Sequence, residues 1–144
     1  MELLLKIVIA YFMFVGAIWV HELGHLGRPR MVRWFPFPTA ESVDASWQYG
    51  GLLVNFVLAF GILLLNSSNV YLNLFGLMNF VHFVIYCFWG SFNKEFNWPQ
   101  RLWRFVTFDD IPNKLWWVFV PLGIISLYLG GDFYWKIATT FFGG

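Results

Sequence analysis

The feature that most constrains this chain is an apolar run at its beginning. Residues 3–20 are apolar except for Lys6, and the helical pattern continues through His25, so we predict one helix over residues 3–26. About 20 apolar residues are enough to cross the hydrocarbon core of a bilayer, and Lys6 can extend its ammonium group to the nearer interface. Because His21-Glu22-Leu23-Gly24-His25 falls where a signal peptidase would cut, we predict a retained transmembrane helix.

The rest of the chain is also typical of a membrane protein. Of its 144 residues, 59% are hydrophobic and only 12% are charged, about half the charged share of an ordinary soluble domain. Further apolar stretches predict helices over residues 50–65, 70–90 and 115–130, with a polar turn at residues 66–69. We therefore predict an all-α fold of four transmembrane helices in a single domain, residues 1–144. No basic tract suits nucleic acid, and the single cysteine excludes an internal disulfide.

Two longer segments separate the predicted helices. Residues 27–46 contain three prolines and several aromatic residues, which excludes a continuous helix and favours an interfacial segment or a short extended hairpin. Residues 91–114 combine polar and aromatic residues and are predicted to form an amphipathic interfacial segment. These two segments hold seven of the nine lysines and arginines, which predicts a multi-pass protein with both segments in the cytoplasm and both termini on the outer side.

The end of the first predicted helix carries a metal-site pattern. His21 and His25 are four residues apart, so their imidazoles lie on one face of a helix and can hold the same zinc ion. Glu22 then lies where it can activate a water molecule bound to that metal. The alternative is a pair of histidines that are hydrogen-bonded inside a helical bundle without metal. Ionisable groups inside a membrane span are costly and usually mark function, which favours the metal site.

A catalytic zinc site needs a third protein ligand, and several residues are candidates. His82 is the remaining histidine, and it shares one face of the third predicted helix with Asn79 and Tyr86 at helical spacing. Such a polar stripe is expected to face the interior of the bundle, where hydrogen bonds between helices are the alternative role. Cys87 matches the depth of the first two histidines better, although a small buried apolar role is its alternative. Glu95 can fold back from the loop, and Asp109 and Asp110 are more distant candidates.

These features together resemble the site-2 protease family of intramembrane zinc metalloproteases. The resemblance covers residues 1–95: HELGH at residues 21–25, the aromatic and proline-rich segment at residues 34–38, the Gly51-Leu-Leu-Val-Asn55 element that opens the second helix, and Asn79 in the third. It implies that residues 34–38 offer an extended edge to an unwound substrate strand. Asn55 and Asn79 would then bind the substrate backbone or the developing oxyanion, with helix packing as their alternative role.

The chain departs from that family at the third ligand. The family uses an aspartate in an Asp-Gly motif at the end of the third core helix, and this chain contains no Asp-Gly dipeptide. Either another residue such as His82 has replaced the aspartate, or the site is altered and inactive. The leading hypothesis is an intramembrane zinc metalloprotease that cleaves membrane-spanning proteins near the cytoplasmic face of the bilayer. The alternatives are a non-catalytic relative that binds membrane proteins, and a haem protein with His21 or His25 and His82 as axial ligands.

Overall fold

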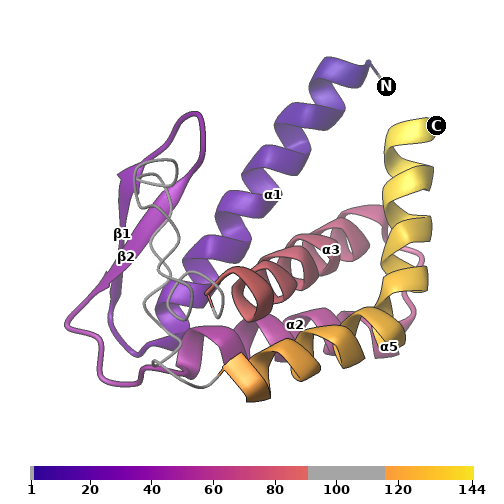
Figure 1. Ribbon diagram of the computed structural model, residues 1–144. Coiled ribbons are helices and arrows are strands. Elements are labelled where there is room, and N and C mark those ends of the chain that lie inside the picture. The colour runs from indigo at the N-terminus through magenta and orange to yellow at the C-terminus, as the bar shows by residue number, and fades with distance from the viewer. Residues whose placement is uncertain (1, 91–115) are drawn as a thin grey trace.

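The computed structural model describes residues 2–90 and 116–144, in which four long helices and one β-hairpin follow each other along the chain (Figure 1). The predicted all-α class is confirmed, and of the two forms expected for residues 27–46 the structure has the hairpin. The elements, in order, are α1 (Leu3–Gly24), β1 (Arg28–Arg33), β2 (Thr39–Val43), α2 (Gly50–Leu65), α3 (Val70–Ile85), the π-helical turn η1 (Tyr86–Gly90) and α5 (Trp116–Gly143).

Three of these helices are long and apolar enough to cross a membrane. They comprise Leu3–Gly24, Val70–Phe88 and Trp117–Gly143, whereas α2 is an apolar helix of 16 residues. At 1.5 Å per residue, α2 extends over about 24 Å, somewhat less than a hydrocarbon core of about 30 Å. Large apolar side chains cover the outside of the bundle, as expected for a protein that associates with a membrane.

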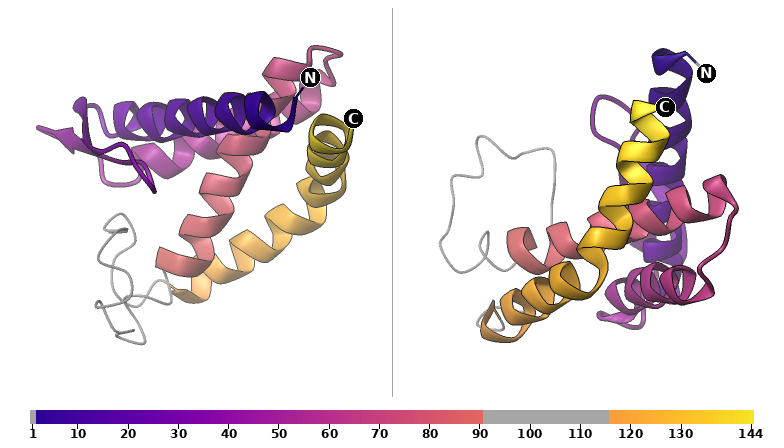
Figure 2. Two further views of the ribbon diagram at one scale, coloured as in Figure 1. Left: turned by 90° about the horizontal axis from the view of Figure 1, so that it is seen from above. Right: turned by 90° about the vertical axis from the view of Figure 1, so that its right-hand side faces the viewer.

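The fourth predicted helix is longer than the sequence pattern suggested. We expected it to end at Gly130, but α5 continues to Gly143 as one helix that changes direction along its length (Figures 1 and 2). Gly130 and Gly131 do not stop it, because Gly130 packs against the Phe80 ring and Tyr134 beyond it is buried. The prediction for residues 91–114 lies outside the described residues.

The turn between α2 and α3 matches its predicted polar character. Asn66 ends α2 with φ 46°, in the left-handed region that asparagine tolerates better than most residues. The Asn69 side chain caps α3, because its Oδ1 accepts hydrogen bonds from the backbone N–H groups of Tyr71 and Leu72. The Asn66 N–H donates to the Leu63 carbonyl, so both ends of this turn are fixed by local hydrogen bonds.

The hairpin lies beside the second half of α1, with both chain termini at the other end of the bundle (Figure 2). Its strands are antiparallel, with Arg28 opposite Val43 and Arg33 opposite Thr39. An ion pair between Arg30 and Glu41 joins the strands, and the Tyr11 hydroxyl of α1 donates a hydrogen bond to the Trp34 carbonyl. We expected the extended edge at residues 34–38, but this segment forms the exposed tip of the hairpin, and the extended residues are those of β1 and β2. Pro36 and Pro38 have no N–H to give to a ladder, which explains the difference.

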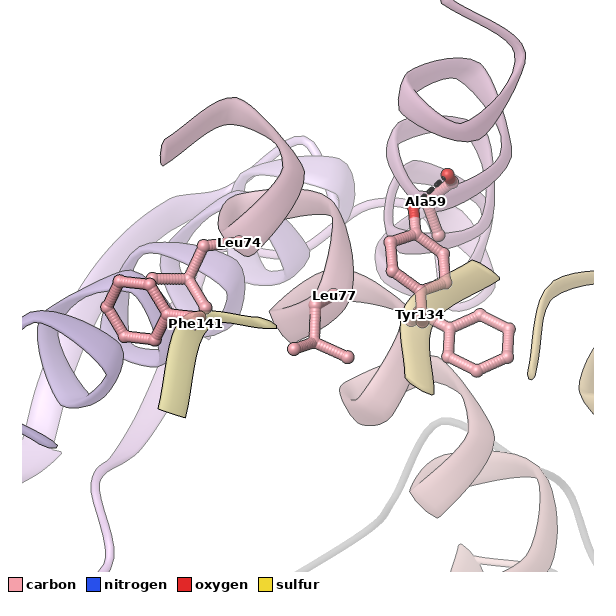
Figure 3. Close-up of a cluster of buried hydrophobic side chains, with 6 residues drawn as sticks. Ala59, Leu74, Leu77, Tyr134 and Phe141 are labelled. Carbon is pink, nitrogen blue, oxygen red and sulfur yellow. Dashed lines mark hydrogen bonds between the residues drawn. The ribbon is translucent and has the colours of Figure 1, made fainter. Parts of the chain in front are cut away.

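The main apolar core lies between α2, α3 and α5 (Figure 3). Tyr134 of α5 is almost fully buried, its ring stacks on Phe80, and its hydroxyl donates a hydrogen bond to the Ala59 carbonyl of α2. Gly76 of α3 makes this contact possible, because a Cβ there would lie 2.7 Å from both Ile62 and the Tyr134 hydroxyl. The core therefore requires a residue without a side chain at position 76.

Adding one methyl group at Gly76 should destabilise the bundle, because Gly76→Ala overpacks this contact at a typical cost of about 1–3 kcal/mol. Gly61→Ala is the matched control, since a Cβ there meets nothing within 4 Å and alanine favours a helix by up to about 1 kcal/mol. Cys87, the only cysteine, is fully buried, so a thiol-reactive fluorophore reports unfolding as a function of temperature. Equal unfolding temperatures for the two variants would contradict this packing.

Candidate metal centre

The end of α1 brings three potential metal ligands together. One ligand atom each from His21, Glu22 and His25 lies within 4.8 Å of the other two, and all three residues are buried. His21 and His25 are one helical turn apart, and their rings have centroids 5.0 Å apart. This group can bind a metal ion, as the spacing predicted.

Three glycines let α1 and α2 approach each other closely at this group. A Cβ on Gly24 would lie 2.4 Å from the Gly50 carbonyl oxygen, and a Cβ on Gly51 would lie 2.6 Å from Nε2 of His21. Backbone therefore packs directly against backbone and against the imidazole. Gly51, the first residue of the Gly51-to-Asn55 element, leaves room for the imidazole, because any side chain there would displace His21.

The segment before α2 fixes the orientation of His25. Its backbone carbonyl accepts hydrogen bonds from the N–H groups of Ser46 and Trp47, while its Nδ1 donates to the Trp47 carbonyl over 2.8 Å. A carbonyl oxygen can only accept, so Nδ1 of His25 carries a proton, and in the neutral imidazole the lone pair is then on Nε2. This is the tautomer that a metal-ligating imidazole needs, held by the kind of outer contact that metal sites commonly show.

Asn55 of α2 connects its own helix to α1 and α3 at the centre of the site. Its Nδ2 donates to the Ala17 carbonyl of α1 over 3.1 Å and to Oδ1 of Asn79 in α3 over 2.8 Å. Asn79 is oriented in turn, because its own Nδ2 donates to the Phe75 carbonyl. With Nδ2 turned toward these acceptors, Oδ1 of Asn55 is the acceptor that faces the imidazoles.

Two imidazoles use that one oxygen. Nδ1 of His21 lies 2.5 Å from Oδ1 of Asn55, and Nδ1 of His82 lies 2.9 Å from it. Both histidines therefore donate from Nδ1, and in the neutral imidazole each carries its lone pair on Nε2. The group of His21, Glu22 and His25 therefore offers two imidazoles and a carboxylate to a metal ion, with the imidazole of His82 beside it.

His82 lies beside the metal-ligand group without being one of its three members. Its ring centroid is 4.8 Å from that of His21, and it is buried as predicted together with Asn79 and Tyr86. Cys87 belongs to an apolar cluster around Phe83, which agrees with its small buried role. Glu95, Asp109 and Asp110 lie outside the described residues, so their roles as ligands stay predictions.

Two adjoining cavities open at Glu22. The larger, about 490 Å³, lies between Glu22, His25, β2 and the segment leading to α2. The smaller, about 170 Å³, lies between α1, the hairpin and the end of α3. Glu22, Ala40 and Tyr86 line both cavities.

The structure adds contacts that the sequence did not indicate. The Tyr86 ring lies 4.7 Å from that of His21 and 5.0 Å from that of His82, at the start of η1. Tyr86 was expected only to face the interior, although π-helical turns are frequent at functional sites. Asn55 and Asn79 are fully buried and line neither cavity, so their role in binding substrate stays a prediction.

Removing the Asn55 side chain should weaken metal binding at this group. Asn55→Leu keeps the side chain's approximate volume but takes away the acceptor that orients His21 and His82, and losing such an outer contact typically costs about 10–100-fold in affinity. Asn73→Leu is the matched control. Asn73 is also a buried asparagine, but it lies in the first turn of α3, away from the histidines, and donates to the Ser67 carbonyl. Titration of the purified protein with Zn²⁺ measures both affinities. An unchanged affinity in Asn55→Leu would contradict this role.

Neither a protein-family model, nor a curated protein, nor a solved structure matches this chain. The chemistry of the site is accordingly inferred from its own residues.

Proposed function

We propose that the protein is an intramembrane zinc metalloprotease that cleaves membrane-spanning proteins. The observation that carries this proposal is the buried group of His21, Glu22 and His25, which lies at the end of a helix long enough to cross a membrane and adjoins a cavity of about 490 Å³. Its composition and spacing are those of zinc-dependent peptidases that place a glutamate beside the first ligand.

The metal ligands in this proposal are His21, His25 and His82. Hydrogen bonds through Nδ1 hold each of the three in the tautomer that carries its lone pair on Nε2. When bound, zinc supplies a Lewis acid that polarises the scissile carbonyl and lowers the pKa of a water ligand. His82 takes the place that an aspartate has in the family that the sequence resembles.

Glu22 is the proposed general base. Its carboxylate is adjacent to the imidazoles and lines both cavities, so it can face the attacking water on one side and the substrate on the other. It removes a proton from that water as the new bond to the carbonyl carbon forms. It then gives the proton to the nitrogen of the departing amine, which leaves uncharged.

Strand β2 is the proposed docking edge for the substrate. A helical substrate hides its peptide bonds and must unwind before it can be cleaved, and an extended segment can then add to the edge of a sheet. Among the described residues β2 pairs with β1 alone, and its residues Ala40, Glu41 and Ser42 line the cavity that contains Glu22. A strand bound along this edge would carry its peptide bonds past the carboxylate.

We further propose that the hairpin faces the cytoplasm and that both termini lie on the outer side. Within the described residues, the hairpin carries Arg28, Arg30 and Arg33, whereas Lys6 and Lys136 lie in the halves of α1 and α5 nearest the termini. A cysteine introduced at Asp44 should therefore react with an impermeant maleimide in inside-out vesicles but not in right-side-out vesicles. The opposite result would reverse the topology.

Two other functions were open from the sequence. A non-catalytic relative that binds membrane proteins would keep the fold without needing Glu22. A haem bound between His21 and His82 is disfavoured, because their rings are 4.8 Å apart and share one acceptor, which leaves no space for a porphyrin. The pairing of His25 with His82 stays a hypothesis.

The Glu22→Gln variant should lose peptide hydrolysis while it keeps bound metal. Removal of a general base typically lowers the rate by about 10²–10⁴-fold. Asp132→Asn is the matched control, because Asp132 is an exposed carboxylate of α5 that pairs with Lys136 and lines neither cavity. Cleavage of a membrane-spanning substrate in proteoliposomes, together with metal analysis of the purified variants, measures both effects.

Two outcomes would change the proposal. Cleavage by Glu22→Gln at the rate of the unmodified protein would contradict its role as the base, and metal-loaded protein that cleaves nothing would favour the non-catalytic relative. Stoichiometric zinc retained in His82→Ala would remove His82 from the ligand set and direct attention to Glu95 or Cys87.

A further inference from the structure

The smaller of the two cavities has the properties of a pocket for one apolar side chain. Hydrocarbon and aromatic residues form most of its wall: Phe14 and Ile18 of α1, Phe37 and Pro38 of the hairpin tip, and Ile85 at the end of α3. Its volume is about 170 Å³, below the roughly 300–1,000 Å³ of pockets for drug-sized ligands. An apolar cavity of about 150 Å³ is enough to take up benzene.

The position of this pocket relates it to the proposed chemistry. Glu22 and Ala40 line both cavities, and β2 runs past both, with Thr39 and Ala40 on the small cavity and Ala40 to Ser42 on the large one. An extended segment along β2 would therefore pass from an apolar site into a polar one at the carboxylate. The substrate side chain on one side of Glu22 would then lie in the apolar cavity, and the side chain on the other side would lie in the polar one.

We propose that the small cavity is a specificity pocket that selects a leucine-sized or phenylalanine-sized residue on one side of the scissile bond. This inference rests on the proposed protease function. The larger cavity, lined by Glu22, Glu41, Ser46 and Gln48, sets no comparable apolar requirement on the other side. A lipid acyl chain is the competing occupant, and it would give no dependence on the substrate residue.

The first test uses a library of membrane-spanning substrates varied at the two residues flanking the cleaved bond. The full-length protein is reconstituted in proteoliposomes with Zn²⁺. At one flanking position, kcat/KM should be at least about tenfold higher for Leu or Phe than for Ala, as expected for filling an apolar pocket. At the other position the same exchange should have little effect.

Substitutions in the wall of the small cavity should change the preference for Leu or Phe in opposite directions. Ile18 is buried in the wall, so Ile18→Phe fills the pocket and should lower the Leu-to-Ala ratio of kcat/KM by at least about tenfold. Phe14→Ala enlarges the pocket and should extend the preference to Trp. Phe12→Ala is the matched control, because Phe12 is two residues away on an exposed face of α1 and should leave the ratio unchanged.

A binding measurement separates failure of the pocket from failure of the protease proposal. Peptide hydroxamates that chelate the metal and carry a methyl, isobutyl or benzyl group are titrated into the zinc-loaded protein. The larger groups should bind at least about tenfold more tightly, and Ile18→Phe should abolish the difference. Glu22-dependent cleavage without any size preference would overturn the pocket and leave the protease. Equal hydroxamate affinities would overturn the pocket even in a protein that cleaves nothing.

Discussion

The arrangement of the site depends on the carboxamide of Asn55. Its two polar atoms make four contacts: Nδ2 with the Ala17 carbonyl and Asn79, and Oδ1 with His21 and His82. These contacts join α1, α2 and α3, so one side chain sets both the positions of the helices and the tautomers of two imidazoles. In an apolar environment an unsatisfied amide or imidazole costs several kcal/mol, so these groups favour a single arrangement. The same bonds that hold the bundle together therefore also orient His21, a member of the group that can bind a metal ion.

Such a short network requires the helices to be close, and this explains the glycines around it. Gly24, Gly50 and Gly51 lie where backbone meets backbone or the His21 ring, at distances that no side chain permits. Small residues are the usual means of bringing helices together in membranes, where van der Waals packing and hydrogen bonds replace the hydrophobic effect. Close packing and the polar network consequently depend on each other: an added Cβ would separate the helices, and separated helices would leave Asn55 without partners.

Most of the helical elements could be predicted from local signals, whereas their contacts could not. The apolar run predicted α1, the limits of α2 were predicted as observed, and Pro36 and Pro38 separated the hairpin from the helices. Gly130 was taken as the end of the last helix, because the contacts with Phe80 and Tyr134 that continue it come from another element. The spacing of His21 and His25 predicted that these residues and Glu22 lie close enough to hold a metal ion. The shared use of Asn55 Oδ1 and the contact of Tyr86 with two imidazoles depend on how α3 crosses α1, which no local pattern contains.

A cluster that only joined helices would not need the cavities beside it. The carboxylate of Glu22 is costly to bury in a membrane, and a network made for stability would surround it with packed side chains. Instead it lies between a cavity of about 490 Å³ with a polar strand edge and one of about 170 Å³ with an apolar wall. Space beside Glu22, an extended strand edge and an apolar pocket next to both suit the peptide substrate that we propose. Stability alone explains the hydrogen bonds of Asn55, whereas the open volume around Glu22 favours catalysis.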